Sequence, residues 1–439
     1  MRIIEGFESA RALLSRQITA ESYPVSETLK QGLMKMFGTD DPDQAVRQIV
    51  GEVKQRGDAA LRDLTLKIDG VKLASLEVDK KEIDDAYQKV DGELVAALEL
   101  AAERIRDFHT AQKNNIWHEI DEGNLRQLIR PLQRVGIYVP GGTAAYPSTV
   151  LMTAVPAKVA GVKEIILVTP PNRYGAVPPV ILVAADIAEV DRIFCIGGAQ
   201  AVAALAYGTK SIPAVDKICG PGNIFVMLAK KQVYGTVDID GLQGPSEVLI
   251  IADETANPEH CAADILAQAE HDALAAVILI TTSRLLADRV IQEVDRQSAG
   301  LSRKEIIAES LEQGIIAVVG SLDEAIELSN LYAPEHLCLM VENAAAYTDK
   351  IANAGCIVLG REATVVLGDY VEGPSHALPT GGTARFSSPL NVSDFIKFIN
   401  VVTVDETSLK RLGPAASIIA RAEGLDAHAR AVEKRLKPE

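Results

Sequence analysis

The feature that most constrains the fold is an alternation of strand-like and helix-like segments, which runs from about residue 130 to 360. The first block opens with the strand-like "RVGIYV", the helix-like "TVLMTAVPAKVAG" and the strand-like "EIILVTPP". A second block starts at "SEVLIIAD" and shares the period of the first without repeating its residues. Strands that alternate with helices of this length favour parallel sheets with helices on both faces. The sequence therefore predicts an α/β fold with two tandem Rossmann-like parallel-sheet domains.

Helical patterns flank the two blocks. Apolar residues recur at three- and four-residue spacing through the first 115 or so residues, and again near the C-terminus. We expect the helical extensions at the two ends to pack on a partner subunit. The predicted segments are a helical extension at 1–29, a helical region at 30–118 that packs on the second α/β domain, the first α/β domain at 119–243, the second at 244–385, and a helical tail at 386–439.

The charge balance narrows the choice of partner. Asp and Glu number 60 against 44 Lys and Arg, for a net charge of −16. A chain this acidic repels phosphate backbones and anionic membranes, so we predict no nucleic-acid partner and no membrane partner, and favour a cationic small molecule. No apolar run reaches the ~18 residues of a membrane span, and the N-terminus lacks the apolar core of a signal peptide. We therefore expect a cytoplasmic protein.

The cysteines do not form a recognisable site. They are odd in number, have no CxxC spacing and lie in apolar segments such as "RIFCIGG". We interpret them as core thiols in a reducing compartment, and not as disulfides or a four-cysteine zinc site. They are Cys195, Cys219, Cys261, Cys338 and Cys356.

Two pairs of residues could contribute to a metal site. Gln268 and His271, three apart on a predicted helix, share one face. They are either a polar helix end or half of a site, since zinc needs about four ligands. Asp369 and His376 lie in a Gly- and Pro-rich loop at 361–390. They are either a turn aspartate and a surface histidine, or oxygen and nitrogen ligands of zinc.

Two further pairs involve histidine. Glu423 and His428, five apart near the C-terminus, are typical of a solvated helix. Glu335 and His336 stand side by side in the otherwise apolar run "LYAPEHLCLM". Burying both is costly unless they have partners or a task, so they are either a satisfied core pair or an acid–base pair with shifted pKa values. The structural interpretation is favoured for the histidines at 109, 118 and 260.

Taken together and in order, several segments resemble the histidinol dehydrogenase family. The resemblance runs from about residue 120 to 435, and the order of the motifs makes it more specific than any one motif alone. No HExxH, GxGxxG or Walker motif is present to suggest another family. The segments are "RVGIYVPGGTAAYPSTVLM", "IGGAQAVAALAYG", "DKICGPGN", "GPSEVL", "LAQAEHD", "YAPEHL", "GDYVEGPSHALPTGGTARFSS" and "EGLDAHARAV".

This resemblance implies a zinc-containing, NAD-dependent homodimer that oxidises L-histidinol to L-histidine in two steps, through a bound aldehyde. The first α/β domain would be the NAD side, the second would carry most zinc and catalytic residues, and the tail would be exchanged between subunits. By resemblance, the zinc ligands are Gln268, His271, Asp369 and His428, and the cofactor contacts are Tyr138, Gln200 and Asn223. The resemblance also implies substrate contacts, which are the same four ligands with Ser246, His336, His376 and Glu423.

The resemblance also implies how the acid–imidazole pair works. His336 would take the hydroxyl proton as hydride leaves, and Glu335 would activate water for attack on the aldehyde. The composite site would explain why no local spacing looks like a zinc site. Two residues depart from the family pattern, namely Asp272, where glycine is expected, and Ser375, where asparagine is common.

Three other functions remain open from the sequence. A relative of the same fold could oxidise another alcohol, such as a sulfonated diol, although an anionic substrate would want Arg or Lys where this chain has Glu423 and Asp369. A metallohydrolase would use the same ligands with Glu335 as base, and would need no dinucleotide. A non-catalytic binding protein is hard to reconcile with an acid–base pair and a ligand set together.

Overall fold

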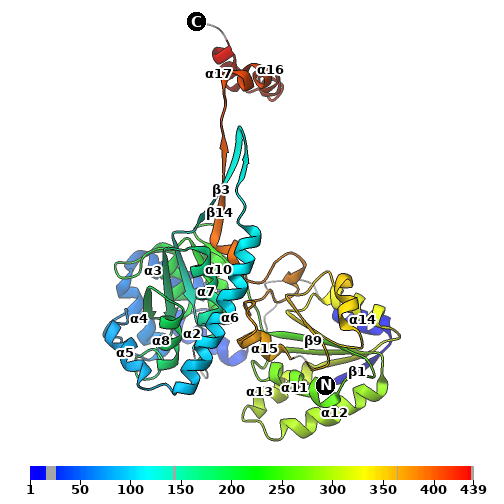
Figure 1. Cartoon of the computed structure of the whole chain (residues 1–439). Helices are drawn as coiled ribbons and strands as arrows, with labels where there is room; N and C mark the ends of the chain where they lie inside the picture. The colour runs from blue at the N-terminus through cyan, green and yellow to red at the C-terminus, as the bar shows by residue number, and fades with distance from the viewer. Residues whose placement is uncertain (16–25, 142–144, 363, 437–439) are drawn as a thin grey trace. The chain divides into compact units, whose positions relative to one another are not determined.

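The computed structural model describes residues 1–15, 26–141, 145–362 and 364–436, in two compact units. The first unit holds Met1–Asn114 and Pro131–Phe395. The second holds Asn115–Arg130 and Ile396–Glu439. Each unit is described below by itself, and Figure 1 labels many of the elements.

The first sheet of the first unit is parallel, with its five strands in the order β6-β5-β4-β7-β8. From the central β4 the chain moves outward through β5 to β6, and then returns to the other side of β4 through β7 to β8. The switch point therefore lies between β4 and β7, where doubly wound sheets bind ligands at the carboxyl edge. The strands are β4 (Arg134–Tyr138), β5 (Glu164–Thr169), β6 (Arg192–Cys195), β7 (Lys217–Cys219) and β8 (Asp238–Ile239).

Helices connect these strands and cover the sheet. Pro147 opens α7, where a missing N–H costs nothing, and Gly161 ends it in the left-handed conformation. Asn223 caps α10, because its Oδ1 accepts from the N–H groups of Phe225 and Val226. The helices are α7 (Pro147–Ala160), α8 (Pro179–Ile187), α9 (Gly198–Tyr207) and α10 (Ile224–Val233).

The second sheet of this unit is also parallel, with six strands in the order β1-β11-β10-β9-β12-β13. Alternate residues of β9 enter two separate apolar clusters, for example Val248 in one and Leu249 in the other, so both faces are buried. The prediction of two tandem parallel-sheet blocks is confirmed. The strands are β1 (Arg2–Glu5), β9 (Glu247–Ala252), β10 (Ala276–Thr281), β11 (Ile315–Val318), β12 (His336–Met340) and β13 (Cys356–Leu359).

Helices cover this sheet as well. One apolar cluster joins it to α11, α12 and α13, and the other joins it to α1 and α14. The elements are α1 (Phe7–Leu14), α11 (Pro258–Ala269), α12 (Arg284–Ser298), α13 (Lys304–Gln313), α14 (Leu322–Tyr332), α15 (Val365–Tyr370), and the 3-10 helices η1 (Ala344–Lys350), η2 (Thr383–Arg385) and η3 (Val392–Phe395).

The N-terminal region differs from the prediction in two ways. Within the segment 1–29, Arg2–Glu5 is a strand that pairs with β11, and 16–25 lie outside the described residues. The helical region 30–118 packs largely on the first sheet's helices, since α3 contacts α9 and α10, and α5 contacts α8. Its contact with the predicted second α/β domain is made by α6, where Arg104 forms an ion pair with Glu372 at 3.3 Å. An apolar stripe shows that a helix needs a partner but does not say which one. The helices are α2 (Glu27–Phe37), α3 (Pro42–Arg56), α4 (Asp58–Asp69), α5 (Lys80–Tyr87) and α6 (Gly92–Ile116).

The second unit combines a small sheet with a helical hairpin. Its strand order is β14-β3-β2, and β2 and β3 form an antiparallel hairpin. The predicted helical tail therefore contains a strand, and residues 119–130 belong here and not to the first α/β sheet. β14 is exposed along most of its seven residues, and a strand without a buried face carries little period-two signal. The elements are β2 (Ile120–Glu122), β3 (Leu125–Pro131), β14 (Ile396–Val402), α16 (Glu406–Ala422) and α17 (Asp426–Leu436).

Two further predictions concern the chain as a whole. All five cysteines are free thiols, four of them buried and Cys356 half-buried, as the sequence predicts. Among the described residues, no helix combines the length and the apolar character that crossing a membrane requires.

Candidate functional site

A cavity of about 840 Å³ in the first unit gathers most of the candidate residues. The carboxyl edge of the first sheet contributes Gly141 after β4 and Asn223 after β7, at the switch point. The second sheet contributes the opposite edge, with Ser246 before β9 and the pair Glu335 and His336 where β12 begins. The carboxyl-edge rule therefore locates half of the site, and the acid–imidazole pair comes from an amino edge that the rule does not indicate.

Glu335 is held by its neighbour across the second sheet. Its carboxylate Oε2 accepts from the N–H of Glu247 at 2.7 Å, and the Glu247 Oε2 accepts from the N–H of Glu335 at 3.3 Å. Both side chains are buried. Burial raises the pKa of the Glu335 carboxyl to about 8, against the opposing influence of the His336 charge. Glu335 is therefore a neutral acid at lower pH that can become a base near its pKa.

His336 lies between hydrogen-bond acceptors on both sides of its ring. Nε2 is 3.0 Å from Asp369 Oδ1, and Nδ1 is 3.3 Å from the Glu247 carbonyl oxygen and 3.8 Å from Glu335 Oε2. Burial alone lowers the pKa of this histidine, but the hydrogen bond to Asp369 and the charge of Glu335 outweigh it and raise the pKa to about 9. In this arrangement His336 is held as an imidazolium.

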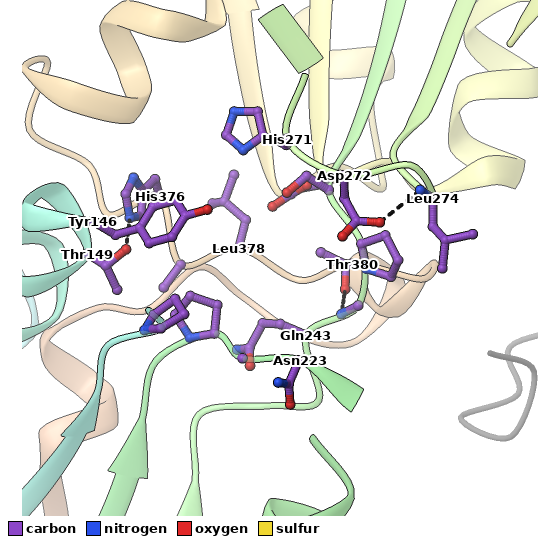
Figure 2. A pocket seen from close by; sticks show the side chains of 18 of the residues that line it. Tyr146, Thr149, Asn223, Gln243, His271, Asp272, Leu274, His376, Leu378 and Thr380 are labelled. Atoms are coloured by element: carbon purple, nitrogen blue, oxygen red, sulfur yellow. Dashed lines mark hydrogen bonds between the residues drawn. The ribbon is translucent and has the colours of Figure 1, made fainter. Parts of the chain in front are cut away.

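Asp369 and His376 are linked through the end of α15. His376 Nδ1 donates to the Asp369 backbone carbonyl at 2.8 Å, and its Nε2 is 3.5 Å from the Thr149 hydroxyl of α7 (Figure 2). Burial lowers the pKa of His376. Burial opposes ionisation of Asp369, yet the hydrogen bond from His336 holds the pKa of its carboxyl below the ordinary value. The pair predicted in the 361–390 loop thus lies in the cavity beside the acid–imidazole pair.

Gln268 and His271 reach the same cavity from the end of α11. Gln268 is buried, and its Nε2 has no hydrogen-bond partner among the described residues. His271 is exposed toward the cavity, and the protein around its ring lowers its pKa. Figure 2 shows the His271 ring across the cavity from Asn223 and Gln243.

The cavity gathers three of the four residues predicted as zinc ligands. Gln268, His271 and Asp369 all line it. The donor set of amide oxygen, imidazole nitrogen and carboxylate oxygen is compatible with zinc. No group of three or more His, Cys, Asp or Glu side chains that could hold a metal occurs within the described residues.

That fourth predicted ligand, His428, lies in the second unit on α17, and the predicted substrate contact Glu423 caps the end of α16. Both are exposed. Neither lines the cavity of the first unit.

The three predicted cofactor contacts have different environments. Asn223 is exposed and lines the cavity. Tyr138 and Gln200 are buried and line neither this cavity nor a second one of about 560 Å³ that shares Pro140 and Gly141 with it. The Tyr138 hydroxyl accepts from the N–H of Gly198, whereas both polar atoms of the Gln200 amide have no partner within the described part of the chain.

The two departures from the family pattern have local partners. Asp272 lines the cavity, and its Oδ1 accepts from the N–H of Leu274 at 2.8 Å, which closes a turn. The Ser375 hydroxyl donates to the Met152 carbonyl at 2.9 Å and accepts from the N–H of Ala377, so it ties the segment that carries His376 to α7.

Sequence reasoning missed Glu247, which contacts both members of the acid–imidazole pair. Its side chain also accepts from the N–H of Gly381 at 3.1 Å. The signal was an acid that opens an otherwise apolar strand in "GPSEVL". Burying an acid at the start of a strand costs free energy unless the acid has partners or a task, as for Glu335.

The fold and the site together define the class of protein to which this chain belongs. A switch-point cavity in a doubly wound sheet, joined to a buried acid–imidazole pair and a mixed set of metal-binding side chains, is the arrangement of an α/β enzyme with a nucleotide-type domain. A sequence model of histidinol dehydrogenase matches residues 35–436. The chain belongs to the histidinol dehydrogenase family, and the resemblance drawn from its motifs is confirmed.

Individual relatives support this membership. The chain is 58% identical over 438 residues to the histidinol dehydrogenase of Dehalococcoides mccartyi (strain CBDB1), covering 100% of both chains. It is 51% identical over 412 residues to that of Clostridium acetobutylicum, covering 93% of this chain and 96% of the relative. The crystal structure of histidinol dehydrogenase from Elizabethkingia anophelis superposes with a TM-score of 0.90 at 39% identity, covering 99% of this chain and 98% of that one.

Proposed function

We propose that this chain catalyses the NAD-dependent oxidation of L-histidinol to L-histidine through L-histidinal, at the end of histidine biosynthesis. The observation that carries the proposal is the meeting of Glu335 and His336 with Asp369 in one cavity, because these residues can move the protons that two successive oxidations release. None of the described residues that line this cavity is Lys or Arg, while Glu335, Asp369 and Asp272 are acidic. Such a lining favours a substrate with an ammonium group.

The proposed holoenzyme binds one zinc ion and NAD. Gln268, His271 and Asp369 would hold zinc together with His428 of a second subunit, and Asn223, Gln200 and Tyr138 would contact NAD. When bound, zinc would orient the imidazole and amino groups of the substrate and would draw the Asp369 charge away from His336. Ser246, His376 and Glu423 would complete the substrate contacts.

In the first step, the neutral His336 ring takes the proton of the substrate hydroxyl while hydride passes from the same carbon to NAD. One C–H bond and one O–H bond break, and the aldehyde and NADH form. A base role requires the neutral ring, so the charge of Asp369 must be engaged elsewhere when the proton is taken.

In the second step, Glu335 takes a proton from water as the water oxygen attacks the aldehyde carbon, and the protonated His336 returns its proton to the carbonyl oxygen, which gives the hydrate and a neutral His336 ring. His336 then takes a hydrate hydroxyl proton while the second hydride leaves, and the carboxylic acid forms. The Glu335 pKa of about 8 supports this assignment, because a base whose pKa lies near the working pH can both accept and release a proton.

We propose a cytoplasmic homodimer in which α16 and α17 cross to the partner and complete its site. The support is that both Glu423 and His428 lie in the second unit, which exposes several large apolar side chains. Exposed apolar surface of this kind is typical of a face that becomes covered. These side chains are Phe398, Val402, Leu412, Ile418 and Ile419.

The test is the NADH yield from limiting L-histidinol with excess NAD. Two equivalents of NADH per substrate, lost on chelation and restored by zinc, are expected. One equivalent would mean an alcohol dehydrogenase that stops at the aldehyde. No NADH from zinc-loaded protein would overturn the proposal in favour of another substrate or of the metallohydrolase alternative.

A further inference from the structure

A buried lysine lies under the loops that form one wall of the cavity. Lys230, on α10, is 1% exposed. Its Nζ donates to the Gly220 carbonyl at 3.1 Å, to the Gln243 Oε1 at 2.9 Å and to Asp240 Oδ1. These three acceptors use all three donors of the ammonium group. The proposed mechanism does not use this lysine.

The aspartate partner holds the same loop from a second direction. The Asp240 side chain is 1% exposed, and its Oδ2 accepts from the N–H of Gly220 at 2.7 Å. The lysine and the aspartate therefore satisfy both polar backbone groups of Gly220. Gly220 has φ of 110°, and a Cβ at this position would lie 2.1 Å from the Tyr138 carbonyl oxygen. The ion pair thus fixes the point where the ends of β4 and β7 approach most closely.

Because Lys230 and Asp240 hold Gly220, they also determine the position of the cavity wall that follows it in the chain. From Gly220 the chain passes through Pro221 and Gly222 to Asn223, and these three residues line the cavity. Asn223 uses its Oδ1 to cap α10, so its Nδ2 group remains to donate to a ligand. Gln243, which Lys230 holds directly, lines the cavity from the loop after β8.

We propose that Lys230, together with Asp240, is a positioning residue for the dinucleotide: it holds the 220–223 loop and Gln243 in the conformation that binds NAD, and touches neither substrate nor metal. This inference rests on the proposed use of NAD. The acid–imidazole pair and the residues proposed as zinc ligands in this unit belong to other segments, so this ion pair does not hold them directly.

A purely structural ion pair is the alternative, and the chain offers a matched control for it. Lys217 lies on β7 at the opposite end from Gly220, and its side chain is 6% exposed. Its Nζ is 3.0 Å from Asp238 and 3.2 Å from Asp394. Lys217→Met removes the charge of a buried lysine from Asp238 and Asp394 without freeing the 220–223 loop.

The experiment compares Lys230→Met and Lys217→Met in the zinc-loaded full chain, with NAD affinity measured by calorimetry and both KM values by NADH formation. For Lys230→Met, the dissociation constant and KM for NAD should rise about tenfold or more, since small displacements of binding groups have effects of this size. The KM for L-histidinol and the zinc content should change by less than about twofold. Lys217→Met should leave NAD affinity unchanged while lowering the urea midpoint.

Several outcomes would overturn the inference. These are unchanged NAD affinity in Lys230→Met, an equal rise of both KM values, or an equal loss of NAD affinity in Lys217→Met. Where Lys230→Met does not fold, Asp240→Asn is the second variant, because its amide still accepts from Lys230 but cannot accept from Gly220 through nitrogen. It should raise the KM for NAD severalfold. Failure of the wild-type chain to reduce NAD with L-histidinol would instead count against the proposed function.

Discussion

The side-chain carboxylates of Glu335 and Glu247 each accept a hydrogen bond from the main-chain N–H of the other residue, at 2.7 and 3.3 Å. They face each other because β9 and β12 are neighbours, with Val248 opposite His336. The Glu247 carbonyl oxygen also accepts from the His336 ring. The position of the acid–imidazole pair is therefore fixed by a residue that the proposed mechanism does not use chemically.

The first prediction follows from this relationship. Glu247→Gln keeps one acceptor oxygen, but its amide nitrogen must face the N–H of either Glu335 or Gly381. Leaving a buried N–H without an acceptor costs about 1–3 kcal/mol, so the free energy of unfolding should fall by that amount. Oxidation of L-histidinal should slow more than oxidation of L-histidinol, since Glu335 serves the aldehyde step. Urea denaturation and separate rate assays with each substrate measure the two effects.

The matched control lies at the other end of the same strand pair. Asp253, just after β9, is buried and accepts from the N–H of Glu342 at 2.9 Å. Asp253→Asn should lower the free energy of unfolding and leave the ratio of the two oxidation rates unchanged. An equal change of that ratio in both variants would contradict a specific role for Glu247.

The second prediction separates the two oxidations. Glu335→Gln should keep the rate of L-histidinol oxidation within about threefold, while oxidation of added L-histidinal falls about 100-fold or more, the usual effect of losing a general base. The NADH yield from limiting L-histidinol should then approach one equivalent at early times. Equal loss in both steps would refute this division of labour.

The third prediction concerns pH. Burial raises the pKa of Glu335 to about 8, so the fraction present as the carboxylate falls about tenfold for each pH unit below that value. Only the carboxylate can take a proton from water, and hence the rate of L-histidinal oxidation should rise from pH 6 to 8. Initial rates of L-histidinal oxidation with saturating NAD, measured from pH 6 to 8, give this pH dependence. A rate that is flat between pH 6 and 8 would exclude Glu335 as the base of this step.

Some features of the fold could be predicted from short stretches of the sequence, whereas others depend on residues that lie far apart in the chain. The two parallel sheets were predictable because their strands are buried on both faces and form apolar runs. The edge strand β1 was not, because it has four residues and its partner lies some three hundred residues further along the chain. The docking of α3 on α9 and α10 was not predictable either, since its stripe of apolar residues fits any apolar surface.

The site shows the same division. Helical spacing drew attention to Gln268 and His271, although α11 ends at Ala269 and His271 follows in a turn, so the two residues share a cavity and not a helix face. The cost of burial drew attention to Glu335 and His336. The contact of Glu335 with Glu247 joins residues 88 positions apart and depends on strand register, which only the folded sheet specifies. The buried pair of Lys230 and Asp240 was not recognisable from the sequence, because a lysine on a helix is usually solvated.

The last prediction tests whether the site is composite. His428→Ala should abolish one zinc equivalent per subunit, and His336→Ala should abolish activity while retaining zinc. Each homodimer should therefore be inactive. When the two variants are unfolded together and refolded as a mixture, the mixed dimers contain one site with both His336 and the partner's His428 intact. About a quarter of wild-type activity should return, since half of the dimers are mixed and each has one complete site of two.

The alternative arrangement gives the opposite result. If His428 served the site of its own chain, every site in the mixture would lack one of the two histidines and no activity would return. Refolded wild-type chain controls for losses during refolding. The zinc content of the mixture is a further control, because the same fraction of zinc sites is complete in both arrangements whereas complete catalytic sites form only in the composite one. Recovered activity would thus show that the tail with α17 completes a neighbour's site, and its absence would place His428 with its own chain.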